Sequence, residues 1–223
     1  DERARAFAQT VKQPMQRSTL EQFINDTQTA ADLLVRSLSR SATLVSSFKQ
    51  IAVDQTSEQR RRFDLSSLVD EVVLTISPST RRAHCQVRTD IAAGLLLNSF
   101  PGPLVQVLTN LIDNAITHGF LPEQSGTIDI VGQPCEEGWI RLTVRDNGRG
   151  IAPEHVKLVF DPFFTTRLGQ GGSGLGLHIV HNIVNNVLGG QIEVQTEVGS
   201  GTSFVLLLPL SAPLAPPKDA DQT

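Results

Sequence analysis

Glycine is distributed unevenly along this chain. All 17 glycines lie at Gly94 or later, and the residues before Gly94 contain none. Proline is sparse in that first part too, where Pro14 and Pro78 occur. A glycine-free stretch favours long helices, because glycine destabilises a helix interior by about 1 kcal/mol. The glycine-rich remainder needs many turns, so the change in composition predicts two different structural units.

Apolar and small residues recur at alternating spacings of three and four within the first unit. The series is Ile24, Thr27, Ala31, Leu34, Leu38, Ser41, Val45, Phe48 and Ala52. Such heptad spacing predicts a coiled coil or a helical bundle. An earlier helix-permissive segment, from Glu2 to about Gln16, contains Pro14, which kinks or breaks a helix. We expect residues 1–62 to form a helical hairpin that dimerises into a four-helix bundle.

The alternative to a dimer is that the hairpin packs onto the second domain of its own chain. Residues 54–62 are charged and polar, and they are interpreted as a solvated linker or a fraying helix end. The tail, residues 211–223, is rich in proline, alanine and charge, which predicts disorder.

Composition narrows the classes of protein that this chain represents. The net charge of −4 argues against a protein that mainly neutralises nucleic acid, so we expect no nucleic-acid partner. No run approaches the ~20 apolar residues that cross a bilayer, and the start lacks a signal peptide. We therefore expect a cytoplasmic fragment that makes no membrane contact itself, although it could belong to a membrane-anchored protein. Cys85 and Cys135 lack the spacing of a zinc site or a disulfide framework.

The pattern from Phe63 onward predicts an α+β sandwich, in which helices lie on one face of a mixed sheet. Its order of helices and strands does not alternate as a doubly wound fold would. The expected helices are 65–76, 103–118, 153–160 and 174–188. The expected strands are 86–91, 95–99, 127–132, 139–145, 191–196 and 202–208.

Three segments of this unit carry chemistry beyond packing. The sequence DNGRG at 146–150 follows a strand, and its glycines allow a ligand to approach the backbone, although a simple turn explains it equally well. Residues 169–176 contain five glycines and open into a helix, as in a phosphate cradle, but could also be a plain flexible loop. The segment 160–167, FDPFFTTR, would pin one end of that loop into the core.

These motifs together resemble a known family. NLIDNAITH, DNGRGI, FDPFFTTR, GGSGLGL and the late GSGT are similar, in order and spacing, to the N, G1, F, G2 and G3 boxes of two-component sensor histidine kinases. The resemblance covers about residues 63–210 and implies an ATP-binding domain of the Bergerat type. The hairpin then occupies the place of the dimerisation and phosphoacceptor domain.

The resemblance implies roles for individual residues. Asp146 would accept a hydrogen bond from the adenine amine, and Asn114 would coordinate Mg²⁺ beside Asn110. Asn110 and Arg167 are the expected catalytic residues. The remaining residues expected to bind the nucleotide are His118, Gly148, Gly150, Ile151, Phe160, Thr166, Gly172, Gly174, Leu175, Gly176, Leu177 and Thr202.

The nature of Asn110 discriminates among the activities of the superfamily. Related ATPases such as gyrase and heat-shock chaperones carry a glutamate there that activates water, and an amide cannot act as that base. Phosphoryl transfer to a histidine, followed by transfer to a response-regulator receiver domain, is therefore favoured. An inactive nucleotide-binding dimeric scaffold and an ATP-hydrolysing protein remain the alternatives.

Two departures from the family pattern are visible. Thr117 stands where the family commonly has a basic residue, so one phosphate contact is lost or passes to His118 or Arg167. The five histidines lie outside the hairpin, so the phosphoacceptor is missing. Its motif is expected upstream of Asp1, and this fragment is expected not to phosphorylate itself. The alternative is a protein that never had such a histidine.

Overall fold

The computed structural model describes residues 20–31, 34–35, 59–120, 125–166 and 173–213. The chain divides into two compact units, Asp1–Phe48 and Lys49–Thr223, which are considered separately. Within the first unit, residues 20–31 and 34–35 are helical, as the heptad pattern predicts. Of the expected hairpin, residues 1–19, 32–33 and 36–58 lie outside the described residues, as does the tail from residue 214. The division into 1–62, 63–210 and 211–223 therefore stays a prediction.

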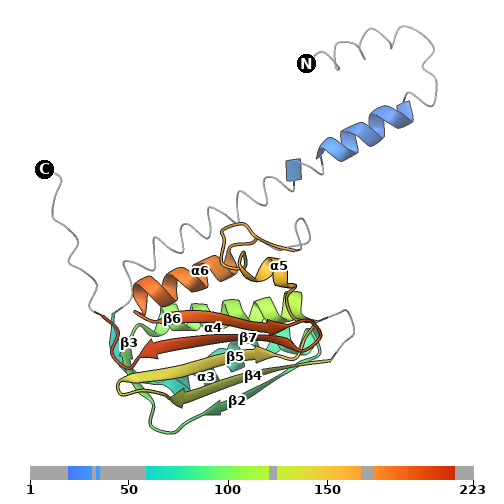
Figure 1. The fold of residues 1–223 in the computed structure, drawn as a ribbon. Helices are drawn as coiled ribbons and strands as arrows, with labels where there is room; N and C mark the ends of the chain where they lie inside the picture. Colours follow the sequence, from blue (N-terminus) through green and yellow to red (C-terminus); the bar gives the residue numbers. More distant parts are fainter. Residues whose placement is uncertain (1–19, 32–33, 36–58, 121–124, 167–172, 214–223) are drawn as a thin grey trace, which may run out of the picture. The chain divides into compact units, whose positions relative to one another are not determined.

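The second unit is an α+β sandwich with one main sheet (Figure 1). The sheet has five strands in the order β2-β4-β5-β7-β6, of which β2 and β4 run parallel and the other neighbours antiparallel. This confirms the predicted mixed sheet. The strands are β2 (Cys85–Ile91), β4 (Gly126–Pro134), β5 (Trp139–Asp146), β6 (Gln191–Glu197) and β7 (Gly201–Pro209).

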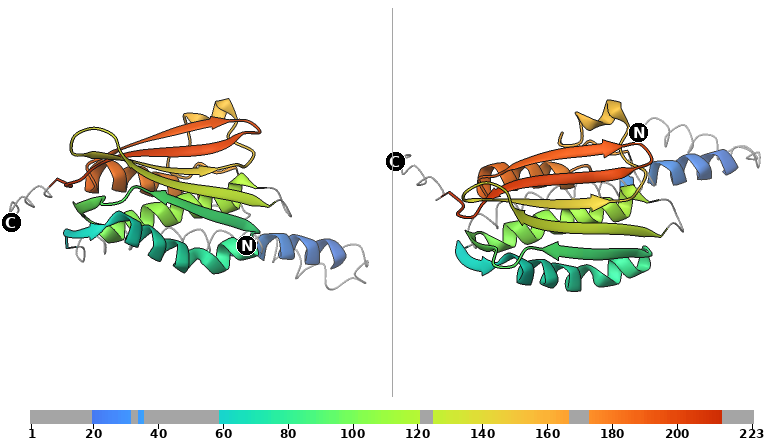
Figure 2. Two further views of the ribbon diagram at one scale, coloured as in Figure 1. Left: turned by 90° about the horizontal axis from the view of Figure 1, so that it is seen from below. Right: turned by 60° about the horizontal axis from the view of Figure 1, so that its bottom comes forward.

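Helices cover one face of this sheet, as predicted (Figure 2). Two of them, α4 and α6, continue directly into short π-helical segments. The helical elements are α3 (Leu65–Arg82), α4 (Pro101–Asn114), η1 (Ala115–Gly119), α5 (Pro153–Val156), α6 (Gly176–Asn182) and η2 (Ile183–Val187). None of the helices in the described ranges is both long and apolar enough to cross a membrane.

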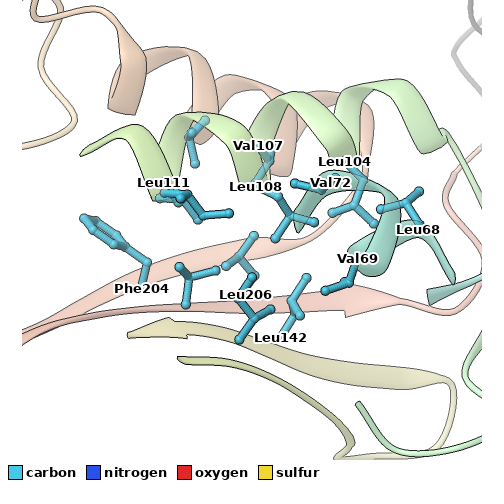
Figure 3. Packing of buried hydrophobic residues seen from close by; sticks show 14 of the residues in the cluster. Leu68, Val69, Val72, Leu104, Val107, Leu108, Leu111, Leu142, Phe204 and Leu206 are labelled. Carbon is cyan, nitrogen blue, oxygen red and sulfur yellow. The ribbon is translucent and has the colours of Figure 1, made fainter. Parts of the chain in front are cut away.

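The core lies between these helices and the sheet. Leu104, Leu108 and Leu111 of α4 are at most 1% exposed and face the inward side chains of β5 and β7, including Leu142 and Leu206 (Figure 3). The apolar residues of α4 recur at helical spacing and form one face of the helix, and those of the strands recur at every second residue and form one face of the sheet. The two apolar faces pack against each other in the core.

The structure differs from the sequence prediction at several boundaries. Helix α3 continues beyond Ile76 to Arg82, through Pro78. Pro78 has no backbone N–H, so the carbonyl of Leu74 loses its helical hydrogen-bond partner. Leu74 is 75% exposed, so water can bind that carbonyl instead. Helix α5 ends at Val156 rather than at Phe160, and turns follow it.

A short strand, β1 (Arg61–Asp64), was missed, because its first two residues, Arg61 and Arg62, were interpreted as the end of the linker. It pairs antiparallel with β3 (Leu96–Ser99) in a separate two-stranded sheet. Ser211, which was expected to belong to the tail, forms a bridge with Asn98 on β3, and Ala212 is buried. The first and last segments of the second unit that the structure describes are therefore both attached to β3.

Candidate active site

A cleft of about 510 Å³ lies between the polar face of α4 and the end of the sheet. Most of the predicted site residues in the described part of the chain meet there, although they come from five separate segments. Those that line the cleft are Asn110, Asn114, His118, Asp146, Gly150, Ile151, Thr166, Gly174, Gly176, Leu177 and Thr202. Residues about 90 positions apart in the sequence therefore form one site.

Asp146 lies at the floor of the cleft, at the last position of β5. Its side chain is 6% exposed, and its Oδ1 accepts a hydrogen bond of 2.9 Å from the Gly148 N–H. Desolvation raises the pKa of Asp146, and backbone hydrogen bonds from Gly148 and Thr202 and the charge of Arg145 oppose this rise. A buried carboxylate with few donors around it is an acceptor that favours a ligand with hydrogens to donate.

The turn after β5 is packed too tightly for side chains. A Cβ on Gly148 would lie 2.8 Å from Asp146 Oδ1 and would also collide with the Gly119 carbonyl. The neighbouring Arg149 N–H donates to that same carbonyl at 2.9 Å, and Arg149 Nε donates to the His118 carbonyl at 2.8 Å. The turn is thus fastened to the end of η1. Gly148 supports Asp146 from behind and is not among the residues that line the cleft.

The polar face of α4 forms the opposite wall, where Asn110 and Asn114 lie one helical turn apart. The Nδ2 atom of Asn110 is buried, and within the described residues it has no hydrogen-bond partner. Because the O and N atoms of an amide are assigned from their hydrogen bonds, either atom of Asn110 could occupy this position. A buried amide atom without a hydrogen-bond partner is costly, so its position in a residue that lines this cleft points to a ligand that completes it.

The loop that carries the glycine run is closed at its base. Phe163 N–H donates to the Gly174 carbonyl at 2.8 Å, which joins the two ends of the loop. Gly174 has φ +69°, and a Cβ there would collide with the Phe163 backbone. From the loop, Thr166 Oγ1 lies 3.4 Å from His118 Nδ1. Arg167 and Gly172 lie outside the described residues, so their predicted roles stay predictions.

Two of the predicted contact residues lie in the core instead of the cleft lining. The Phe160 ring centroid lies 5.2 Å from that of His181 and 6.4 Å from that of Phe204. Leu175 is 8% exposed. We therefore assign Phe160 to anchoring the start of the loop, which agrees with the predicted pinning role, and Leu175 to packing beneath the loop's end.

Sequence reasoning missed several residues that line the cleft. Asp113 lies at its rim, where burial of the carboxyl group raises the pKa. Asp113 could have been predicted from the sequence, because it belongs to the polar stripe of α4 and lies between Asn110 and Asn114. The other lining residues that were missed are Gly119, Arg149, Ala152, His155, Val159, Phe164, Ser173 and Val198.

The described residues fit a nucleotide with magnesium. The cleft has the size of a small-molecule site, its floor carries the acceptor carboxylate, and its wall carries the unpartnered amide. Among the described residues, no three His, Cys, Asp or Glu side chains cluster as a metal site. The predicted magnesium ion would be held by the amide oxygen of Asn114, beside Asn110, together with phosphates and water.

Comparisons with known proteins agree with this geometry. Residues 101–212 match the family model "Histidine kinase-, DNA gyrase B-, and HSP90-like ATPase". Sensor histidine kinase ZraS of Escherichia coli (strain K12) is 35% identical over 149 residues, which are 66% of this chain and 30% of ZraS. Sensor protein SrrB of Staphylococcus aureus (strain NCTC 8325 / PS 47) is 43% identical over 111 residues, 47% of this chain and 18% of SrrB. The chain thus spans less than a third of these relatives.

Solved structures show the same fold. The catalytic domain of histidine kinase ThkA, in a nucleotide-free form, superposes with a TM-score of 0.60 at 28% identity, covering 69% of this chain and 97% of that chain. ThkA in complex with response regulator protein TrrA has a TM-score of 0.60 at 26% identity and covers 92% of this chain and 55% of that chain. This chain belongs to the histidine kinase-, DNA gyrase B- and HSP90-like ATPase family, and its relatives there include sensor histidine kinases.

Proposed function

We propose that this chain is the kinase core of a sensor histidine kinase, which binds ATP with Mg²⁺ and transfers the γ-phosphoryl group to a histidine. The observation that carries the proposal is the pairing of two unusual groups in one cleft. Buried Asp146 forms the floor, and the unpartnered amide of Asn110 belongs to the wall. The first suits the amine of adenine, and the second suits the phosphate end of the same nucleotide.

The residues of the chain position the reactants and contribute no covalent chemistry. A histidine nitrogen of the acceptor forms a bond to the γ-phosphorus while the bond to the bridging oxygen breaks and ADP leaves. Bound magnesium would neutralise charge on the phosphate oxygens. Asn110 has no basic atom with which to deprotonate water, which favours the histidine over water as acceptor.

We propose two partners for the complete protein. One is a second copy of the protein, joined through the helical hairpin that is predicted within residues 1–62. The other is the receiver domain of a response regulator. The second is supported by the solved complex of histidine kinase ThkA with the response regulator protein TrrA.

A phosphotransfer assay tests the proposal. The chain is incubated with γ-labelled ATP, Mg²⁺ and a separate helical domain that contains a phosphoacceptor histidine. We expect acid-labile label on that domain and none when its histidine is replaced by glutamine. Phosphate release without an acceptor would identify an ATPase, and tight ATP binding without any transfer would identify a scaffold.

Nucleotide affinity is expected to depend on the protonation of Asp146. The ionised carboxylate accepts the adenine amine, and burial raises the pKa of this group in the free protein. The affinity for ADP is therefore expected to fall as the pH drops through the raised pKa, because protonation then competes with the ligand. Calorimetric titrations across the acidic range measure the affinity for ADP at each pH. Asp146→Asn is the control, because it lacks the titrating carboxyl group while the nucleotide titrates as before. Parallel pH profiles for the two proteins would contradict the prediction.

A further inference from the structure

Three polar side chains form a row across the end of the sheet beneath the cleft. Asp146 on β5 pairs with Thr202 on β7, and Thr202 pairs with Thr196 on β6. Directly paired residues lie on the same face of a sheet, so these three are lateral neighbours. Asp146 and Thr202 line the cleft, and Thr196 stands behind them. Both cleft residues of the row are buried at 6% exposure.

The hydroxyl group of Thr196 is fully engaged by its surroundings. Its Oγ1 accepts a hydrogen bond of 2.9 Å from the Ile151 N–H and donates one of 3.0 Å to the Gly201 carbonyl. A third contact of 3.2 Å joins its Oγ1 to Thr202 Oγ1. An N–H can only donate, a carbonyl can only accept, and a hydroxyl has one hydrogen.

These restrictions fix the direction of the third contact. Thr196 uses its hydrogen on the Gly201 carbonyl, so all three contacts are satisfied together when Thr202 donates its hydroxyl hydrogen to Thr196. The oxygen of Thr202 then retains lone pairs and no hydrogen. Beside it, the Asp146 carboxylate is also an acceptor. The floor of the cleft is in this way an edge that offers acceptors.

We propose that Thr196 is a positioning residue for base selection, because it holds Thr202 as an acceptor beside Asp146. The inference rests on the adenine-binding function proposed above and extends it to a residue outside the cleft lining. A purine with an amino group at position 6 offers hydrogens to this edge. A purine with an oxygen at that position brings another acceptor against it and is disfavoured.

The test compares the affinities of ADP and inosine diphosphate (IDP), which carries an oxo group in place of the 6-amino group and a hydrogen on the neighbouring N1. Calorimetric titration is applied to the wild type, Thr196→Val and Thr196→Ser. We expect Thr196→Val to reduce the preference for ADP over IDP by about two- to tenfold, the range of one hydrogen bond. Without its partner, the Thr202 hydroxyl turns and donates to the 6-oxo group. Thr196→Ser retains the hydroxyl and is expected to retain the preference.

Structural damage is distinguished by the ratio of the two affinities. A Thr196→Val protein that loses affinity for both nucleotides equally would overturn the inference, since only the support of the Ile151 loop would then be involved. Thr143→Val is the matched control, because it removes a threonine hydroxyl from β5 on the other face of the sheet. We expect the same preference as in the wild type.

Two further outcomes separate this inference from the proposed function. A wild type that binds ADP and IDP equally would refute the adenine site and the inference with it. A wild type that prefers ADP, with an undiminished preference in Thr196→Val, would overturn the inference alone. If Thr196→Val does not fold, Thr202→Val takes its place, and an unchanged preference in that variant overturns the inference.

Discussion

Replacing Asp146 with asparagine is expected to weaken ADP binding by about ten- to a hundredfold. A hydrogen bond to a charged group contributes about 1.5–3 kcal/mol, and the substitution also turns a donor of the side chain toward the adenine amine. The fold should survive, because Asn Oδ1 still accepts from the Gly148 N–H and a buried charge is removed. We expect the free energy of unfolding to change by less than about 1.5 kcal/mol.

Calorimetric titration with ADP and urea denaturation measure the two quantities separately. Asp129→Asn is the matched control, since it neutralises one carboxylate on β4 and lies outside the cleft lining. That variant is expected to bind ADP as the wild type does. Equal ADP affinity in Asp146→Asn and in the wild type would remove the adenine contact from the proposal.

Strand β5 was predictable because apolar and polar residues alternate along it, and β7 because it is a short apolar run. Strands β5 and β7 were placed within one or two residues of their ends, since every second side chain is buried. Strand β1 has no such alternation, and its partner β3 follows more than 30 residues later, so pairing at long range created it. The expectation that proline breaks a helix likewise ended α3 too early. The sequence does not show that Leu74, whose carbonyl loses its partner at Pro78, is exposed to water.

The site was predictable where a motif was present. The asparagines of α4, the acidic turn and Thr202 were found through the family resemblance, and the fold brings them to one cleft. Thr196 was missed, because a threonine in an alternating strand looks ordinary. Its significance comes from three contacts to Ile151, Gly201 and Thr202, which need the β6–β7 hairpin to lie against the turn after β5. Such contacts between segments are absent from any local pattern.

Replacing Asn110 with alanine is expected to have the largest effect on phosphoryl transfer. Removal of one group that positions charge in a transition state typically lowers the rate by about 10²–10³-fold. Stability should be retained, because the Nδ2 atom of Asn110 is buried without a hydrogen-bond partner among the described residues. Its removal therefore breaks no bond to Nδ2 and relieves a desolvated group. Single-turnover transfer of labelled phosphate to a histidine-bearing domain measures the rate, and thermal unfolding measures the stability.

The matched control is Gln106→Ala, one helical turn earlier on the polar face of α4 and outside the cleft lining. It removes an amide of similar size and is expected to transfer phosphate at the wild-type rate. The affinity for ADP in the absence of Mg²⁺ should be nearly unchanged in Asn110→Ala, since the adenine contact at Asp146 is intact. If Asn110→Ala transfers phosphate normally but unfolds more easily, Asn110 stabilises the fold. The role in phosphoryl transfer proposed for its amide would then be wrong.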